Sequence, residues 1–151
     1  MFKSKNIIKP KRTFLGIIIR YFIDNLTKKF PLPKINPNKV SGLSVIFSIT
    51  FVLTFGYSKI ISFLFLFLVI FCDFLDGAIS KRYYKKNIEG YIVDVTSDRI
   101  SEGIIFSFFF FPWFYLFTLN IFLTIWSFLN KKHIILPLRQ IFIIYFGFFV
   151  L

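Results

Sequence analysis

Long apolar stretches separated by short basic segments make up most of this 151-residue chain. Hydrophobic residues account for 56% of the sequence and charged residues for only 17%, which leaves too few polar side chains to cover a small soluble domain. A membrane-spanning helix needs roughly 20 predominantly apolar residues. Five stretches meet that requirement: Val40–Tyr57, Ile60–Ser80, Gly90–Phe111, Trp113–Asn130 and Ile134–Leu151. The sequence therefore predicts an all-α integral membrane protein with five transmembrane helices, in a membrane-embedded domain over residues 40–151.

The net charge of +12 follows a membrane pattern rather than the pattern of a nucleic-acid-binding domain. Basic residues gather in blocks at residues 1–39, Lys81–Lys86 and Lys131–Lys132, with apolar runs between them. A nucleic-acid-binding domain would instead spread its basic residues over a folded polar surface. Because basic connections stay in the cytoplasm, we expect a multi-pass protein of the cell membrane with a cytoplasmic N-terminus and no nucleic acid as partner.

The first 39 residues are predicted to form a cytoplasmic basic segment ahead of the membrane domain. Within it, Thr13–Phe30 places apolar side chains on one helical face and polar ones on the other, as in an amphipathic helix at the membrane interface. No secretory signal peptide is expected, because the first ten residues lack an apolar core and no small-residue cleavage site follows. Asn36 followed by Pro37 is typical of a helix N-cap and first turn, and predicts where the first span begins.

Four aspartates lie near the cytoplasmic ends of the second and third predicted spans. Asp73 and Asp76 are three residues apart and Asp94 and Asp98 are four apart, so each pair shares one helical face. Two antiparallel neighbouring helices would bring both pairs together at one depth. Unpaired carboxylates there would repel one another, at a cost of roughly 2.5–3.5 kcal/mol each. All-oxygen ligation suits Mg²⁺ or Mn²⁺, and four carboxylates can hold two ions, as in phosphoryl-transfer sites.

Two glycines complete a recognisable pattern around these aspartates. Residues 73–98 read D-x2-D-G-x2-S-K-x8-G-x3-D-x3-D. This pattern resembles the signature of the CDP-alcohol phosphatidyltransferase family, D-x2-D-G-x2-A-R-x8-G-x3-D-x3-D. The four aspartates, Gly77, Gly90 and every spacing match, whereas Ser80–Lys81 replaces Ala-Arg and Arg82 comes next.

The resemblance implies a membrane enzyme in which an alcohol displaces CMP from a CDP-linked lipid or, in some members, from a CDP-linked head group. It implies a six-helix fold, commonly dimeric, with the active site facing the cytoplasm, so five spans would make this chain a short or C-terminally truncated member. By position, two Mg²⁺ or Mn²⁺ ions would be bound by Asp73, Asp76 and Asp94, with Asp98 beside the second ion as the catalytic base. The CDP and diphosphate of the donor would contact Asp76, Gly77, Ser80, Lys81, Arg82 and Gly90.

Two basic residues outside the signature are candidates for binding the acceptor. Arg139 lies about two turns into the fifth predicted span, where a charge is rare and usually faces a cavity or a partner. It is expected to contact a phosphate of a substrate or, alternatively, to reach the interface or pair with Glu102. Together with His133, which also suits an ordinary interfacial position, it weakly favours a phosphorylated alcohol as the acceptor.

Other functions remain open on the sequence. An inactive family relative could act as a partner subunit. A membrane prenyltransferase also uses aspartates and Mg²⁺ on diphosphates, although it needs more spans and lacks this glycine spacing. A cation channel or transporter could line its pathway with carboxylates, although the first and fourth predicted spans contain no charge.

Overall fold

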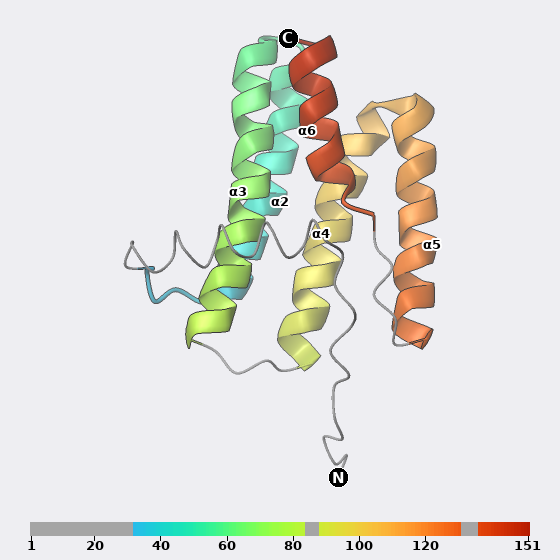
Figure 1. The fold of residues 1–151 in the computed structure, drawn as a ribbon. Helices are drawn as coiled ribbons and strands as arrows, with labels where there is room; N and C mark the ends of the chain where they lie inside the picture. The colour runs from blue at the N-terminus through green and yellow to red at the C-terminus, as the bar shows by residue number, and fades with distance from the viewer. Residues whose placement is uncertain (1–31, 84–87, 131–135) are drawn as a thin grey trace.

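The computed structural model describes residues 32–83, 88–130 and 136–151, and those ranges are almost entirely helical (Figure 1). The helices are α2 (Pro37–Phe55), α3 (Lys59–Tyr83), α4 (Ile88–Phe108), η1 (Phe110–Phe114), α5 (Tyr115–Asn130) and α6 (Leu138–Phe149). The described ranges contain no strand, so the predicted all-α fold is confirmed there. The expected amphipathic helix at Thr13–Phe30 and the residue His133 lie outside the described residues.

Helix α2 begins where the sequence predicts. The Asn36 side chain accepts a hydrogen bond from the backbone N–H of Asn38 at 3.0 Å, and Pro37 occupies the first turn. This cap satisfies one of the amide groups that a helix start leaves without an intrahelical partner. The turn between α2 and α3 is short, so the two helices run antiparallel side by side (Figure 1).

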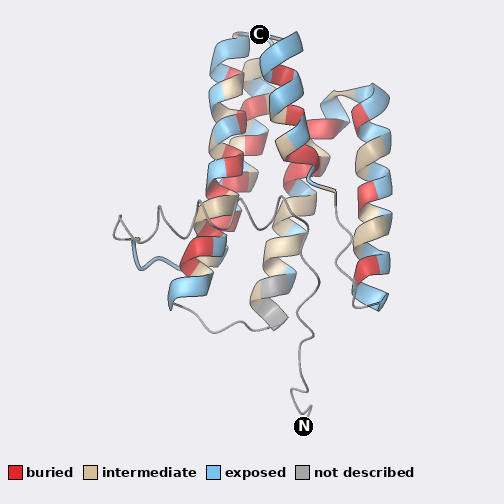
Figure 2. Cartoon of the chain, viewed as in Figure 1, coloured by how far each residue is buried: buried red, intermediate tan, exposed pale blue. Residues whose placement is uncertain are grey.

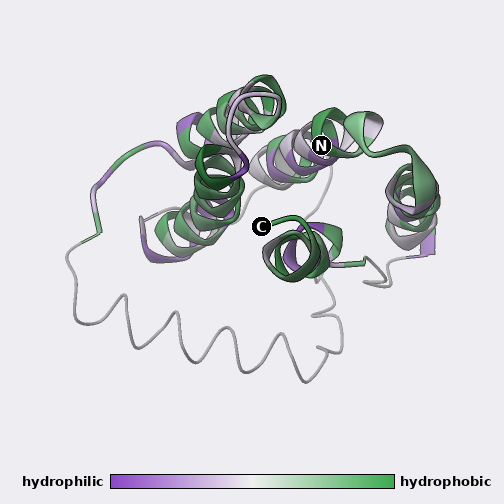
Figure 3. Ribbon diagram, turned by 90° about the horizontal axis from the view of Figure 1, so that it is seen from above, coloured by the Kyte–Doolittle hydropathy of each residue, from purple (hydrophilic) through white to green (hydrophobic). Residues whose placement is uncertain are grey.

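Within the described ranges, three helical stretches are long and apolar enough to cross a membrane: Pro37–Phe55, Lys59–Tyr83 and Phe110–Asn130. Large apolar side chains also cover much of the outer surface (Figures 2 and 3), as expected where lipid rather than water surrounds a protein. Helix α4 is long enough but carries the acidic residues, and α6 has only 12 residues. The predicted count of five spans is therefore not confirmed, although all five predicted stretches contain helix.

Helix α2 lies at the centre of the packing that positions the acidic residues. Most close approaches between helix backbones join α2 to α3 and α2 to α4. Helices α3 and α4 run antiparallel, as the sequence predicts (Figure 1). Both helices use α2 as a common support, and their acidic faces meet beside it.

Buried aromatic rings anchor α6 against the other helices. Phe142 of α6 lies with its ring centroid 5.2 Å from Phe106 of α4 and 4.9 Å from Trp113 of η1. One turn later, the Phe146 ring lies 5.7 Å from Phe51 of α2. Such pairs contribute about 0.5–1.5 kcal/mol each beyond the area that they bury. The cluster fixes α6 only one turn away from Arg139.

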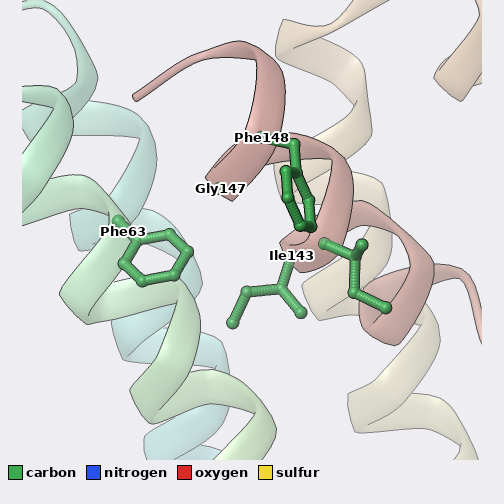
Figure 4. A pocket seen from close by; sticks show the side chains of 5 residues that line it. Phe63, Ile143, Gly147 and Phe148 are labelled. Atoms are coloured by element: carbon green, nitrogen blue, oxygen red, sulfur yellow. The ribbon is translucent and has the colours of Figure 1, made fainter.

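An apolar cavity of about 380 Å³ lies between α3 and α6. Figure 4 shows its lining by Phe63, Ile143, Gly147 and Phe148, together with Ile144. The cavity is lined by Phe63, ten residues before Asp73 in α3, and by residues of α6 that begin one turn after Arg139. No charged or polar side chain lines it, which excludes it as the place where a diphosphate binds.

Candidate active site

Three helices bring acidic side chains and one arginine to a single cluster. Helix α3 contributes Asp73 and Asp76, α4 contributes Asp94, Asp98 and Glu102, and α6 contributes Arg139. We call the five acidic residues the carboxylate cluster. Its members are close enough for electrostatic repulsion between Asp73 and Asp98, and among Asp76, Asp94 and Asp98. The four aspartates of the sequence pattern therefore lie together in the folded chain.

Arg139 connects the two acidic helices through its guanidinium group. Nη1 donates to Asp73 Oδ1 at 2.9 Å, and Nη2 lies 2.5 Å from Asp73 Oδ2 and 2.7 Å from Asp98 Oδ1. The bond to Asp73 is thus bidentate, a geometry for which the planar guanidinium is well suited. Arg139 is only 3% exposed, so this is a buried ion-pair network.

The position of Arg139 differs from the one predicted from the sequence. Helix α6 begins at Leu138 instead of Ile134, so Arg139 lies in the first turn and not two turns into the helix. Its Nε is 3.9 Å from Glu102 Oε1 and has no hydrogen-bond partner among the described residues. Pairing with Glu102, one of the alternatives that the sequence allowed, is therefore the weakest of its contacts.

Asp76 has a neutral partner. The Ser41 hydroxyl of α2 donates to Asp76 Oδ2 at 2.7 Å, and Asp76 is only 4% exposed. A hydroxyl satisfies a lone pair but supplies no positive charge, so ionisation of the buried Asp76 would be favoured by a cation nearby. The bond also joins α3 to α2 at the depth of the carboxylate cluster.

A second polar group supports the cluster from α5. Glu102 lies 2.7 Å from Arg99 Nη1 and accepts a hydrogen bond from Asn120 Nδ2 at 3.2 Å. Asn120 also donates to the backbone carbonyl of Leu136 at 3.0 Å and accepts from its N–H at 2.9 Å. Asn120 is fully buried. Asn120 is not among the site residues predicted from the sequence, although an amide in the middle of an apolar span is a signal that could have identified it.

Comparison with protein families decides which group the chain belongs to. The family model for CDP-alcohol phosphatidyltransferases matches residues 34–151, which is most of the chain. The chain belongs to the CDP-alcohol phosphatidyltransferase family. No curated protein and no solved structure matches it. Membership in this family makes phospholipid-type transfer from a CDP-alcohol the general activity, and members of the family generally depend on divalent metal ions.

The family signature continues into the last turns of α3 and the first turn of α4. A Cβ atom added at Gly77 would meet no atom of the described residues within 4 Å, so packing against the described helices does not explain a glycine there. Ser80 is half-buried, Lys81 and Arg82 are exposed in the last turn of α3, and Gly90 is half-buried. These residues lie at the same end of α3 and α4 as the aspartates, next to an open space beside Gly77.

The charge and donor atoms of the cluster suit the divalent ions on which this family generally depends. Five carboxylates lie with two guanidinium groups, Arg99 and Arg139, so full ionisation of the acids would leave an excess of three negative charges in this set. Carboxylate oxygens are the ligands that Mg²⁺ and Mn²⁺ prefer. In their present positions, however, no three acidic, histidine or cysteine side chains of the described residues are arranged to hold one ion.

Proposed function

We propose that this protein transfers a phosphatidyl-type group from a CDP-activated lipid to a polar alcohol and releases CMP. One observation carries the proposal: the four signature aspartates of α3 and α4 meet in one cluster with excess negative charge. Family membership supplies the donor class. A prenyltransferase or a cation transporter has no comparable support, because the family match covers the whole described part of α2 to α6.

The reaction is a displacement at phosphorus. The acceptor hydroxyl oxygen forms a bond to the phosphorus that carries the lipid group, and the bond from that phosphorus to the bridging oxygen breaks. CMP leaves with the bridging oxygen, and the hydroxyl proton passes to Asp98. Two bound divalent cations would neutralise the diphosphate and the charge that develops on the leaving phosphate. The residues of the chain position the reactants and accept the proton.

Metal binding and proton acceptance are assigned to individual aspartates by their positions in the family signature. Asp73, Asp76 and Asp94 would hold the two Mg²⁺ or Mn²⁺ ions, and Asp98 would lie beside the second ion. The side chain of Asp98 is 29% exposed and that of Asp73 is 14% exposed. The greater exposure of Asp98 suits a base that must reach the hydroxyl of an incoming acceptor.

The end of α3 would receive the nucleotide part of the donor. The open space beside Gly77 allows close approach of a ligand to the helix backbone. Lys81 keeps the positive charge of the arginine in the family signature but lacks its bidentate fork, which the neighbouring Arg82 could supply. Ser80 and Gly90 complete the expected contacts to CDP and diphosphate.

The location of the cluster suits a lipid donor and a water-soluble acceptor. Because basic residues follow α3, we place this end of the helices at the cytoplasmic face of the membrane. A phosphorylated acceptor would bring its phosphate toward Arg139, the cation at the carboxylates. The proposed role of His133 in acceptor binding lies outside the described residues.

The test is product formation by the full-length chain in lipid nanodiscs. CDP-diacylglycerol is supplied with Mg²⁺ and a panel of alcohols that includes glycerol 3-phosphate, inositol phosphate and their unphosphorylated forms. We expect CMP and one new phospholipid, identified by mass, and the loss of both with EDTA or with Asp98→Asn. Asp24→Asn, the same chemical change at an aspartate outside the family signature, should retain activity.

The absence of CMP with every acceptor and with both diacyl and ether-linked CDP-lipids would refute the proposed enzyme and favour an inactive relative. Consumption of a labelled prenyl diphosphate would instead identify a prenyltransferase. Mn²⁺ flux into proteoliposomes without CMP formation would identify a cation transporter.

A further inference from the structure

Arg139 occupies the carboxylate oxygens that the proposed function assigns to metal ions and to the base. One nitrogen, Nη2, lies 2.5 Å from an Asp73 oxygen and 2.7 Å from an Asp98 oxygen. The two oxygens come from different helices. Because both contact the same nitrogen, they lie close to each other. A positively charged group therefore already bridges α3 and α4 at the carboxylates.

We infer that Arg139 is an internal competitor of the divalent cations: it holds Asp73 and Asp98 in the metal-free protein and must release them when the ions bind. This inference rests on the proposed function, because it takes the signature aspartates as metal ligands. A guanidinium and a divalent cation on the same carboxylates repel each other, and the repulsion is strong where water is excluded. Arg139 is almost completely buried, so little solvent screens it.

The surroundings of Arg139 allow its side chain to move while its backbone stays in place. Its Nε has no hydrogen-bond partner among the described residues, and Glu102 Oε1 lies 3.9 Å away as an alternative acceptor. The backbone of Leu136, three residues earlier, is held by two hydrogen bonds to Asn120. Phe142, three residues later, is fixed in the aromatic cluster. A shift of the guanidinium toward Glu102 would therefore require no movement of α6.

Release of Arg139 would also free the proposed base. While Nη2 contacts Asp98 Oδ1, the guanidinium occupies that oxygen and blocks the approach of an acceptor hydroxyl to it. Metal loading would thus expose Asp98 to the acceptor and leave a guanidinium available near the substrate phosphates. In this scheme the ion pair keeps the metal-free cluster stable, and metal binding converts it to the reactive arrangement.

Mn²⁺ binding tests the competition without any substrate. Full-length protein in nanodiscs is titrated with Mn²⁺, and free Mn²⁺ is measured by its electron paramagnetic resonance signal. We expect Arg139→Gln to bind Mn²⁺ about tenfold more tightly than the unmodified chain, within the usual range of coupling between two sites. Arg99→Gln is the matched control, because it removes the same charge from an arginine whose only ion-pair partner among the described residues is Glu102. Its gain in affinity should be clearly smaller.

A second variant distinguishes the effect of the guanidinium contacts to the aspartates from the effect of the positive charge. It also remains informative if Arg139→Gln fails to fold. Arg139→Lys keeps the positive charge but cannot contact both aspartates with a planar fork, so it should also bind Mn²⁺ more tightly than the unmodified chain. Equal or weaker binding by the Arg139 variants, an equal gain in Arg99→Gln, or no Mn²⁺ binding by any of the proteins would overturn the inference. If the competition is observed but no CMP forms in the product assay, the proposed function fails on its own.

Discussion

Replacement of Asn120 by leucine tests how the polar contacts of α5 support the carboxylate cluster. The side chains are similar in size, so the change removes three hydrogen bonds without leaving a large cavity. Bonds between membrane helices average about 0.6 kcal/mol each, which gives a loss of about 2 kcal/mol. The unsatisfied amide and carbonyl of Leu136 would add a desolvation cost of about 1–3 kcal/mol. We therefore expect Asn120→Leu to lower the free energy of unfolding by about 3–5 kcal/mol.

Asn130→Leu is the matched control for this prediction. Asn130 lies exposed at the end of the same helix, and among the described residues its amide donates to the carbonyl of Trp126, one turn earlier. Surface changes of this kind usually stay within about 0.5 kcal/mol. Reversible unfolding in mixed micelles, followed by circular dichroism, measures both variants. If the two differ by less than about 0.5 kcal/mol, the contacts of Asn120 do not hold α5 to α4 and α6, and the reasoning is refuted.

Two further substitutions test the nucleotide end of the site and the aromatic core. Gly77→Ala should stabilise α3 by up to about 1 kcal/mol, because none of the described residues lies where the methyl group would go. It should nevertheless raise the KM for CDP-lipid by narrowing the approach of the ligand to the helix backbone. Gly42→Ala in α2 has equally open surroundings and should leave the KM unchanged; equal KM values for both variants would contradict a ligand at Gly77. Phe142→Ala should lower the free energy of unfolding, measured by heat or denaturant, by about 3–5 kcal/mol. Phe148→Ala, at an exposed position, should lower it far less. Similar losses of stability in both variants would show that the aromatic cluster does not anchor α6.

The sequence predicted the elements and the acidic faces because these depend on local spacing. The Asn36 cap and the start of α2 follow from one dipeptide. The positions of Asp73 and Asp76 on one face, and of Asp94 and Asp98 on another, follow from the helical period. These features require no knowledge of which helices are neighbours.

The arrangement of the helices was less predictable because spacing does not identify packing partners. Nothing in the loop between α3 and α4 indicates that α2 supports both of them, as the Ser41–Asp76 bond and the neighbouring contacts show. The pairing of Arg139 with Asp73 joins residues 66 positions apart in the chain. A charge in an apolar span predicts that the residue has a partner, but the sequence does not show which of several acidic residues is that partner.

The polar residues that the sequence left unassigned explain why the cluster can have one definite geometry. In lipid, the hydrophobic effect gives little preference for one apolar helix–helix contact over another. Polar contacts and close packing therefore determine how the helices are arranged. Ser41 of α2, Asp73 of α3, Glu102 of α4, Asn120 of α5 and Arg139 of α6 each contribute a polar contact at the same cluster. The contacts that specify how the helices assemble are therefore the contacts that position the proposed chemistry. A substitution that removes one of these contacts should therefore change both the stability of the protein and its affinity for metal ions. If the helix bundle were stable without these contacts, stability and metal affinity would instead change independently.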